Sequence, residues 1–228
     1  MQSVNKYIKN IRLYVTESEK NLQINDITAT ELESIWGDVC DAYPNFEIFF
    51  SFNSERMTSS QTIPYGLLEN LKMEKIDDMV NFKLSKANFT GLSDFELDIS
   101  LLTEDNFDEF AAFHDSRNGD MFWTSTRIGK KFDIWRIHIL KKCGATTGYS
   151  MMMATEKNTE IFAVVADVES EKQAILQVAC KNIFAEGRNE VLFMIDANDE
   201  ALQEIARVIG FKQTGFYQGF RGIIPPFL

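Results

Sequence analysis

The second half of this chain alternates strand and helix patterns in a fixed order, and that order restricts the fold more than any other feature. The pattern reads strand, helix, three strands, helix, strand, helix, strand. These segments lie at 95–100, 103–113, 135–140, 147–154, 161–168, 171–186, 191–195, 199–209 and 211–222. The alternation predicts an α/β fold in which three antiparallel strands follow one another along the chain.

The first half carries a shorter version of the same alternation. Thr30 and Glu33 have the spacing of a capping box at the start of a helix. Pro64 has the position of a first helical residue in a second, shorter helix. The predicted segments are a strand at 11–16, a helix at 30–43, an aromatic strand at 46–52, the short helix after Pro64, and a strand at 79–84.

Turn residues around Gly91 predict a boundary between a subdomain at 1–92 and a domain at 93–228. The order helix, aromatic strand, helix, extended segment occurs at 30–84 and again at 170–223. Two interpretations remain open. One is chance similarity between alternating elements, and the other is a degenerate duplicated half-domain.

The charge of the chain excludes nucleic acid as a main partner. The 228 residues hold 34 Asp and Glu against 23 Lys and Arg, a net charge of -11, whereas nucleic-acid binding depends on clustered basic residues. No apolar run approaches the length of a membrane span, and no apolar leader follows Met1. We therefore expect a cytoplasmic protein without a nucleic-acid or membrane partner.

Cysteine and histidine usage excludes several other chemistries. Cys40, Cys143 and Cys180 are far apart and odd in number, which suits reduced thiols, and no CxxC pair predicts a metal site. His114 and His138 are the only histidines, and without a GxSxG elbow they do not suggest a serine hydrolase. Motifs of dinucleotide-binding and P-loop proteins are also missing from the sequence.

Short sequence words after residue 95 resemble the Gcn5-related N-acetyltransferase (GNAT) superfamily. They are Leu101-Leu102-Thr103-Glu104-Asp105, Gly148-Tyr149, Asn198-Asp199-Glu200-Ala201, Ile209-Gly210-Phe211 and Gly215-Phe216-Tyr217. The resemblance implies a mixed, mostly antiparallel sheet flanked by helices, preceded by a partial GNAT-like αβ subdomain. It also implies an N-acetyltransferase that uses acetyl-CoA as co-substrate and acts on an amine of a small molecule or peptide. A homodimer remains an open alternative to a monomer.

The resemblance implies a cofactor site where the helix near Glu171 begins, because a helix N-terminus attracts phosphate groups. Family members usually carry glycines before this helix, whereas the sequence here has none, and the register of the loop is open. Glu169 and Glu171 are expected to face the anion, or else to stabilise their own helix as an ordinary acidic first turn. The candidate cofactor-binding residues are Val165, Ala166, Val168, Ser170, Glu171, Lys172, Gln173 and Asn198.

The candidate catalytic residues are Tyr217 as the general acid and Glu160 as the general base. The family often places a Tyr before its Gly-Phe pair, whereas this chain has Ile205-Ala206-Arg207 there, so Tyr217 is a substitute. The alternatives are a half-buried strand aromatic for Tyr217 and a solvated turn carboxylate for Glu160. The missing glycines and Tyr also leave open a non-catalytic GNAT-like protein that binds acyl-CoA or regulates.

Overall fold

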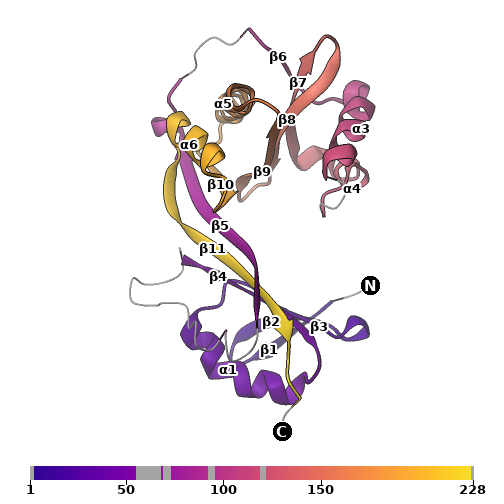
Figure 1. Cartoon of the computed structure of the whole chain (residues 1–228), viewed down its shortest axis with the longest axis vertical. Coiled ribbons are helices and arrows are strands. Elements are labelled where there is room, and N and C mark those ends of the chain that lie inside the picture. The colour runs from indigo at the N-terminus through magenta and orange to yellow at the C-terminus, as the bar shows by residue number, and fades with distance from the viewer. Residues whose placement is uncertain (1–2, 55–67, 69–72, 92–95, 119–121, 227–228) are drawn as a thin grey trace. The chain divides into compact units, whose positions relative to one another are not determined.

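The computed structural model describes residues 3–54, 68, 73–91, 96–118 and 122–226, and it divides into two compact units (Figure 1). Unit 1 comprises residues 1–80 and 214–228, and unit 2 comprises residues 81–213. This division differs from the predicted boundary after residue 92, because the strands β5 (Glu74–Ser85) and β11 (Lys212–Ile223) each belong partly to both units. The helix predicted after Pro64 lies outside the described residues.

Unit 1 is built around a helix that connects two parallel strands. β3 and β4 pair in parallel over all four residues of β3, from Asn21 opposite Glu47 to Ile24 opposite Phe50. A hairpin of β1 and β2 pairs with β3 on one side, and β11 pairs antiparallel with β4 on the other. The elements are β1 (Val4–Ile8), β2 (Ile11–Thr16), β3 (Asn21–Ile24), α1 (Ala29–Ala42) and β4 (Glu47–Asn53).

The capping box of α1 lies two residues earlier than the sequence predicts. Thr28 is extended, so its hydroxyl accepts from the backbone N–H of Glu31, and the Glu31 carboxylate accepts from the N–H of Thr28 at 2.8 Å. The predicted pair of Thr30 and Glu33 is therefore wrong. Starting at Ala29, the helix buries one apolar face against the aromatic core around Phe50.

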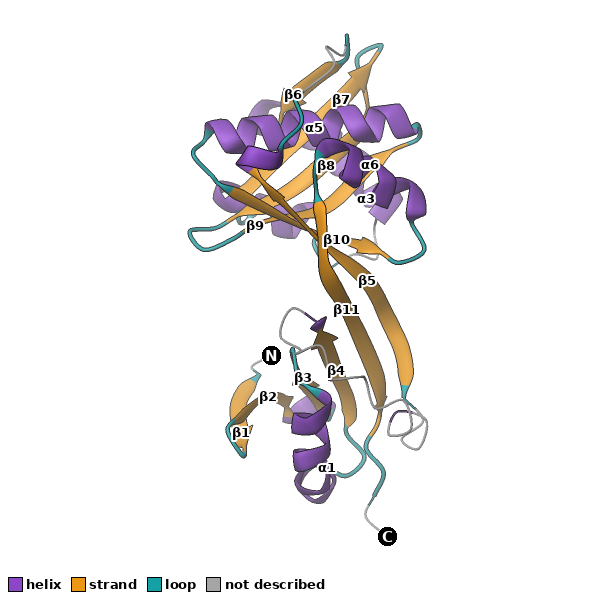
Figure 2. Cartoon of the chain, turned by 90° about the vertical axis from the view of Figure 1, so that its left-hand side faces the viewer, coloured by secondary structure: helices purple, strands orange, loops and turns teal. Residues whose placement is uncertain are grey.

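Unit 2 has the predicted mixed, mostly antiparallel sheet with helices on both sides. Its strand order is β5-β10-β9-β8-β7-β6, with only the β9–β10 pair described as parallel. α3 lies on one side of these strands and α5 on the other (Figures 1 and 2). The elements are β6 (Asp98–Leu101), α3 (Phe107–Asn118), α4 (Ser125–Gly129), β7 (Trp135–Lys142), β8 (Ala145–Ala154), β9 (Thr159–Ala166), α5 (Glu169–Ala185), β10 (Glu190–Asp196) and α6 (Glu200–Ile209).

The last helix of unit 2 ends at a glycine with no room for a side chain. Gly210 has φ +107°, and a Cβ there would lie 2.1 Å from the backbone oxygen of Asn88. Asp199 caps the other end by accepting from the backbone N–H of Leu202 at 3.0 Å. These two residues fix α6 between its predicted limits.

His138 is a buried polar residue of β7. Its Nε2 accepts from the Asn182 side-chain amide at 2.8 Å, whereas its Nδ1 has no hydrogen-bond partner among the residues that the structure describes. Burial lowers the pKa of His138 to about 4, and Glu186 opposes part of this effect. The imidazole is therefore neutral in the folded protein at neutral pH.

The pKa of His138 predicts acid sensitivity. An unfolded histidine has a pKa of about 6.5, so protons bind the unfolded chain first, and stability falls as the pH drops from 6.5 towards the folded value of about 4. Between pH 7 and pH 5, the wild type should lose about 2 kcal/mol more than His138→Gln does in urea unfolding. Equal losses in the two proteins would contradict this account.

Candidate functional site

The parallel strands β9 and β10 pair over a short stretch and then part. Their register covers only Glu160 opposite Leu192 and Ile161 opposite Phe193. β9 continues to Ala166 without further described pairing to β10. A bulge in β9 begins directly after Ile161, because the register with β8 shifts there. This edge of β9 is therefore free to pair with a ligand.

The helix α5 begins directly beyond the parted end of β9, and no side chain caps its first turn. Its N-cap residue is Val168, which is extended and 46% exposed and whose side chain cannot accept a hydrogen bond. In unit 1, by contrast, Thr28 and Glu31 occupy the corresponding end of α1. The first backbone N–H groups of α5 are therefore available to an anion, as a phosphate site at a helix N-terminus requires.

The charges around this helix end are largely balanced. Arg117 donates to Asp167 at 2.9 Å, and this bond holds the pKa of the Asp167 carboxyl below its usual value. Lys142 forms an ion pair with Glu171, which is buried. The expectation that Glu171 faces the anion is therefore wrong, because its carboxylate points to the end of β7. Glu169 remains exposed in the first turn.

The other predicted cofactor residues surround the turn from β9 into α5. Val165 lies opposite Tyr149 of β8, and Ala166 is buried opposite Gly148. Within α5, Ser170 is exposed, and Lys172 and Gln173 are half-buried. Asn198 is exposed after the end of β10, where its side chain donates to Asp196 at 3.1 Å.

Gly148 allows β8, β9 and α5 to pack closely beside the site. A Cβ at this position would lie 2.6 Å from the backbone oxygen of Val165 and 3.1 Å from Cδ1 of Ile175. Both contacts are closer than a Cβ normally allows. The glycine noted in the sequence thus has a packing role that positions the turn.

Glu160 lies where β9 and β10 part. It is half-buried and paired with Met153 of β8 and Leu192 of β10. Burial raises the pKa of its carboxyl. The alternative of a solvated turn carboxylate is wrong, because β9 begins at Thr159 and includes Glu160. A half-buried carboxylate with a raised pKa is suited to accepting a proton near neutral pH.

Tyr217 belongs to unit 1, so the two candidate catalytic residues are not in the same unit. It lies on β11 opposite Asn53. Burial is the main cause that raises the pKa of its hydroxyl, which is also hydrogen-bonded to Ser51. The structure therefore does not bring Tyr217 and Glu160 together within one unit.

A buried polar network next to Val165 was missed by sequence reasoning. The Tyr149 hydroxyl lies 2.7 Å from Nδ1 of His114 and accepts from the Asn118 side chain at 2.7 Å. Nε2 of His114 lies 2.8 Å from the backbone oxygen of Trp123. The bonds are satisfied if the hydroxyl donates to Nδ1 and Nε2–H donates to the carbonyl. The network fixes α3 on β8, and its only sequence signal is a histidine on an otherwise aromatic helix face.

Two further searches cover the described part of the chain. No three acidic, histidine or cysteine side chains within it gather as a metal site would require. None of its helices is long and apolar enough to cross a membrane.

Comparisons with known proteins place the fold. No family model and no curated protein matches the sequence. Among solved structures, a GCN5-related N-acetyltransferase from Sphaerobacter thermophilus is similar, with 15% identity, a TM-score of 0.68, and coverage of 95% of this chain and 78% of that chain.

A functionally unknown conserved protein from Staphylococcus epidermidis has 13% identity and a TM-score of 0.65, over 96% of this chain and 94% of that chain. A tandem GNAT protein from the clavulanic acid biosynthesis pathway has 10% identity and a TM-score of 0.62, over 96% of this chain and 79% of that chain. Together with the parted strands and the helix beyond them, these likenesses show that the chain has the fold of the GNAT acetyltransferases.

Proposed function

We propose that unit 2 is an acetyl-CoA-dependent N-acetyltransferase whose acceptor is an amine of a small molecule or peptide. The observation that carries the proposal is the uncapped start of α5 at Val168, directly beyond the free edge of β9. Anion-binding amides and an unpaired strand edge are the two features that a long ligand with a phosphate-bearing end requires.

The residues present fit acetyl-CoA despite the loop without glycines. The N–H groups at Glu169 and Ser170 begin α5 and would hold the phosphates, and Lys172 adds positive charge in the same turn. Arg117 and Lys142 offset Asp167 and Glu171. When bound, acetyl-CoA supplies the thioester whose acetyl group is transferred. The backbone N–H groups of β9 near Val165 would polarise the acetyl carbonyl.

Glu160 has the role of general base in this proposal. The acceptor amine must lose a proton before it can attack, and a carboxylate with a raised pKa accepts that proton more effectively near neutrality. Tyr217 as general acid remains a prediction, since its hydroxyl is bonded to Ser51 in unit 1. The cysteines Cys40, Cys143 and Cys180 are all unbridged, which supports a cytoplasmic location.

Capping α5 artificially tests the proposed cofactor site. Val168→Asp should stabilise the protein by about 1 kcal/mol, because the new carboxylate would accept from the free N–H groups. The same change should weaken acetyl-CoA binding by about 10-fold or more, since it removes those donors and adds negative charge. Urea unfolding measures the first effect, and isothermal titration with acetyl-CoA measures the second.

Val168→Ser is the matched control, because it offers a cap without a charge. It should weaken binding less than Val168→Asp. Unchanged acetyl-CoA affinity in both variants would contradict a site at this helix. The second candidate function, a non-catalytic acyl-CoA-binding or regulatory protein, is favoured by the loop without glycines. Binding of acetyl-CoA without release of free thiol, across a panel of amines, would support it.

A further inference from the structure

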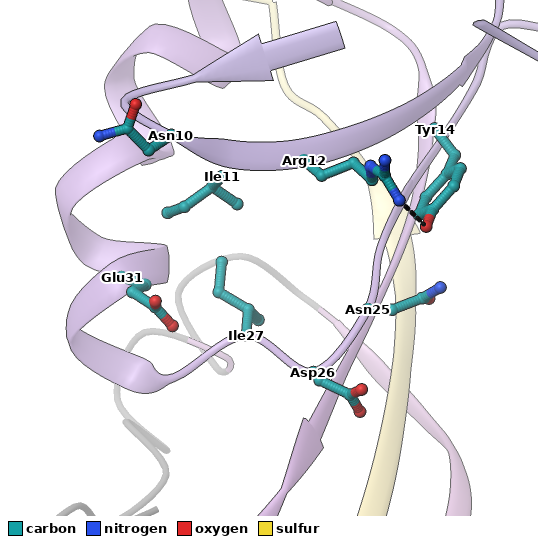
Figure 3. Close-up of a pocket in the computed structure, with 8 residues that line it drawn as sticks. All are labelled: Asn10, Ile11, Arg12, Tyr14, Asn25, Asp26, Ile27 and Glu31. Carbon is teal, nitrogen blue, oxygen red and sulfur yellow. Dashed lines mark hydrogen bonds between the residues drawn. The ribbon is translucent and has the colours of Figure 1, made fainter. Parts of the chain in front are cut away.

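Unit 1 contains a cavity of about 410 Å³ that the proposed transferase does not use. It lies between the β1–β2 hairpin, the loop after β3 and the start of α1 (Figure 3). Its lining includes Arg12 and Tyr14 from β2, Asn25 and Asp26 from the loop, and Glu31 from α1. Both signs of charge therefore line one small space.

The cavity arises because β2 extends past its partner strand. The described pairing of β2 with β3 stops at Tyr14 opposite Gln23. After Ile24 the chain turns through Asp26, which has φ 52°, and the next residue donates its backbone N–H to the oxygen of Ser51 at 2.9 Å. The loop thus joins β4 and leaves the edge of β2 beside Arg12 open.

Arg12 is held in place by two tyrosines. Its Nε donates to the Tyr7 hydroxyl at 3.2 Å and its Nη1 donates to the Tyr14 hydroxyl at 3.3 Å. Its guanidinium also lies 5.9 Å and 5.7 Å from the centres of these two rings. A guanidinium has five N–H donors, so these bonds leave donors at its outer end. A positioned guanidinium of this kind binds a carboxylate through two parallel hydrogen bonds.

The loop and helix supply the opposite charge. Glu31 is fixed by bonds from the N–H and the hydroxyl of Thr28, at 2.8 Å and 2.7 Å, and both leave it ionised. Asp26 adds a second carboxylate to the lining. Ile11 and Ile27 also line the cavity, and Figure 3 shows their side chains between the Arg12 and Glu31 ends. A cation, an anion site and an apolar surface are thus arranged around one volume.

These charges discriminate between ligand classes. A phosphate would be repelled by Asp26 and Glu31, and a simple amine would be repelled by Arg12. A molecule with a carboxylate and an ammonium group satisfies both ends. We propose that this cavity binds a small aliphatic α-amino acid, with its carboxylate on Arg12, its ammonium group towards Asp26 and Glu31, and its side chain over Ile11 and Ile27.

The test is isothermal titration of the full chain with L-leucine. Two analogues serve as controls, 3-methylbutylamine, which lacks the carboxylate, and 4-methylpentanoate, which lacks the ammonium group. L-leucine is expected to bind, and each analogue should bind at least about 10-fold more weakly, because each leaves one buried charge without a partner. No heat of binding from L-leucine, L-valine or L-isoleucine at millimolar concentration would overturn the proposal.

Variants locate the site. Arg12→Gln and Asp26→Asn should each weaken L-leucine binding by at least about 10-fold, and asparagine tolerates the positive φ of position 26. Arg221→Gln is the matched control, since Arg221 is an exposed strand arginine of the same unit that pairs with Glu47 and Glu74. Undiminished binding in both cavity variants would overturn the proposal. Acetyl-CoA binding should be unchanged in them, which separates this inference from the proposed function.

Discussion

Replacing Gly148 by valine is expected to destabilise the protein by about 3 kcal/mol or more. The first added carbon alone would lie 2.6 Å from the backbone oxygen of Val165, and backbone cannot move aside as the end of a flexible side chain can. The two further methyl groups would meet Ile175 and push α5 away from β8. Urea unfolding of the variant and the wild type measures the difference.

Gly37→Ala is the control for this change, because nothing lies within 4 Å of a Cβ at that position in α1. Alanine there should stabilise the protein by about 0.5 to 1 kcal/mol through helix propensity. The two glycine substitutions are thus expected to have opposite signs. A Gly148→Val protein as stable as the wild type would show that β8, β9 and α5 do not pack as described.

Replacing Glu160 by glutamine should lower acetyl transfer by about 100-fold or more, the usual contribution of a general base. The side chain keeps its size and its place on β9, so acetyl-CoA binding should change little. The raised pKa of Glu160 also predicts that the wild-type rate falls at a higher pH than an ordinary carboxylate would give. Thiol release with an amine from the acceptor panel measures the rate against pH.

Glu156→Gln is the matched control, because Glu156 is an exposed carboxylate in the turn before β9. It should leave the rate and its pH dependence unchanged. A Glu160→Gln variant with full activity and the wild-type pH profile would remove Glu160 from the chemistry. Loss of activity together with loss of acetyl-CoA binding would instead assign it a structural role.

Much of the fold could be predicted from the sequence, because the signals concerned are local. The apolar periodicity of α5 and the alternation in β8 depend on residues a few positions apart. Asp199 and Gly210 limit α6 through contacts within its own turns and, for Gly210, through its backbone conformation. The short strands β1 and β3 were missed, because each gains its pairing from a neighbour and carries a weak pattern of its own.

The parts of the site that could not be predicted depend on contacts between distant residues. Lys142 and Glu171 form their ion pair across 29 positions, and Arg117 reaches Asp167 across 50. The presence of Tyr217 in unit 1 follows from the pairing of β11 with β4. Nothing in the local sequence around Glu171 or Tyr217 indicates where its side chain points, so the acids of α5 read as an obstacle to an anion.

One titration tests the central claim, that a single acetyl-CoA site lies at the uncapped start of α5. In unit 1 the corresponding helix is capped by Thr28 and Glu31, and its strands β3 and β4 pair along all of β3, so no second site is expected there. Isothermal titration of the full chain with acetyl-CoA should therefore give a stoichiometry of one. Either no binding or two equivalents per chain would contradict the account.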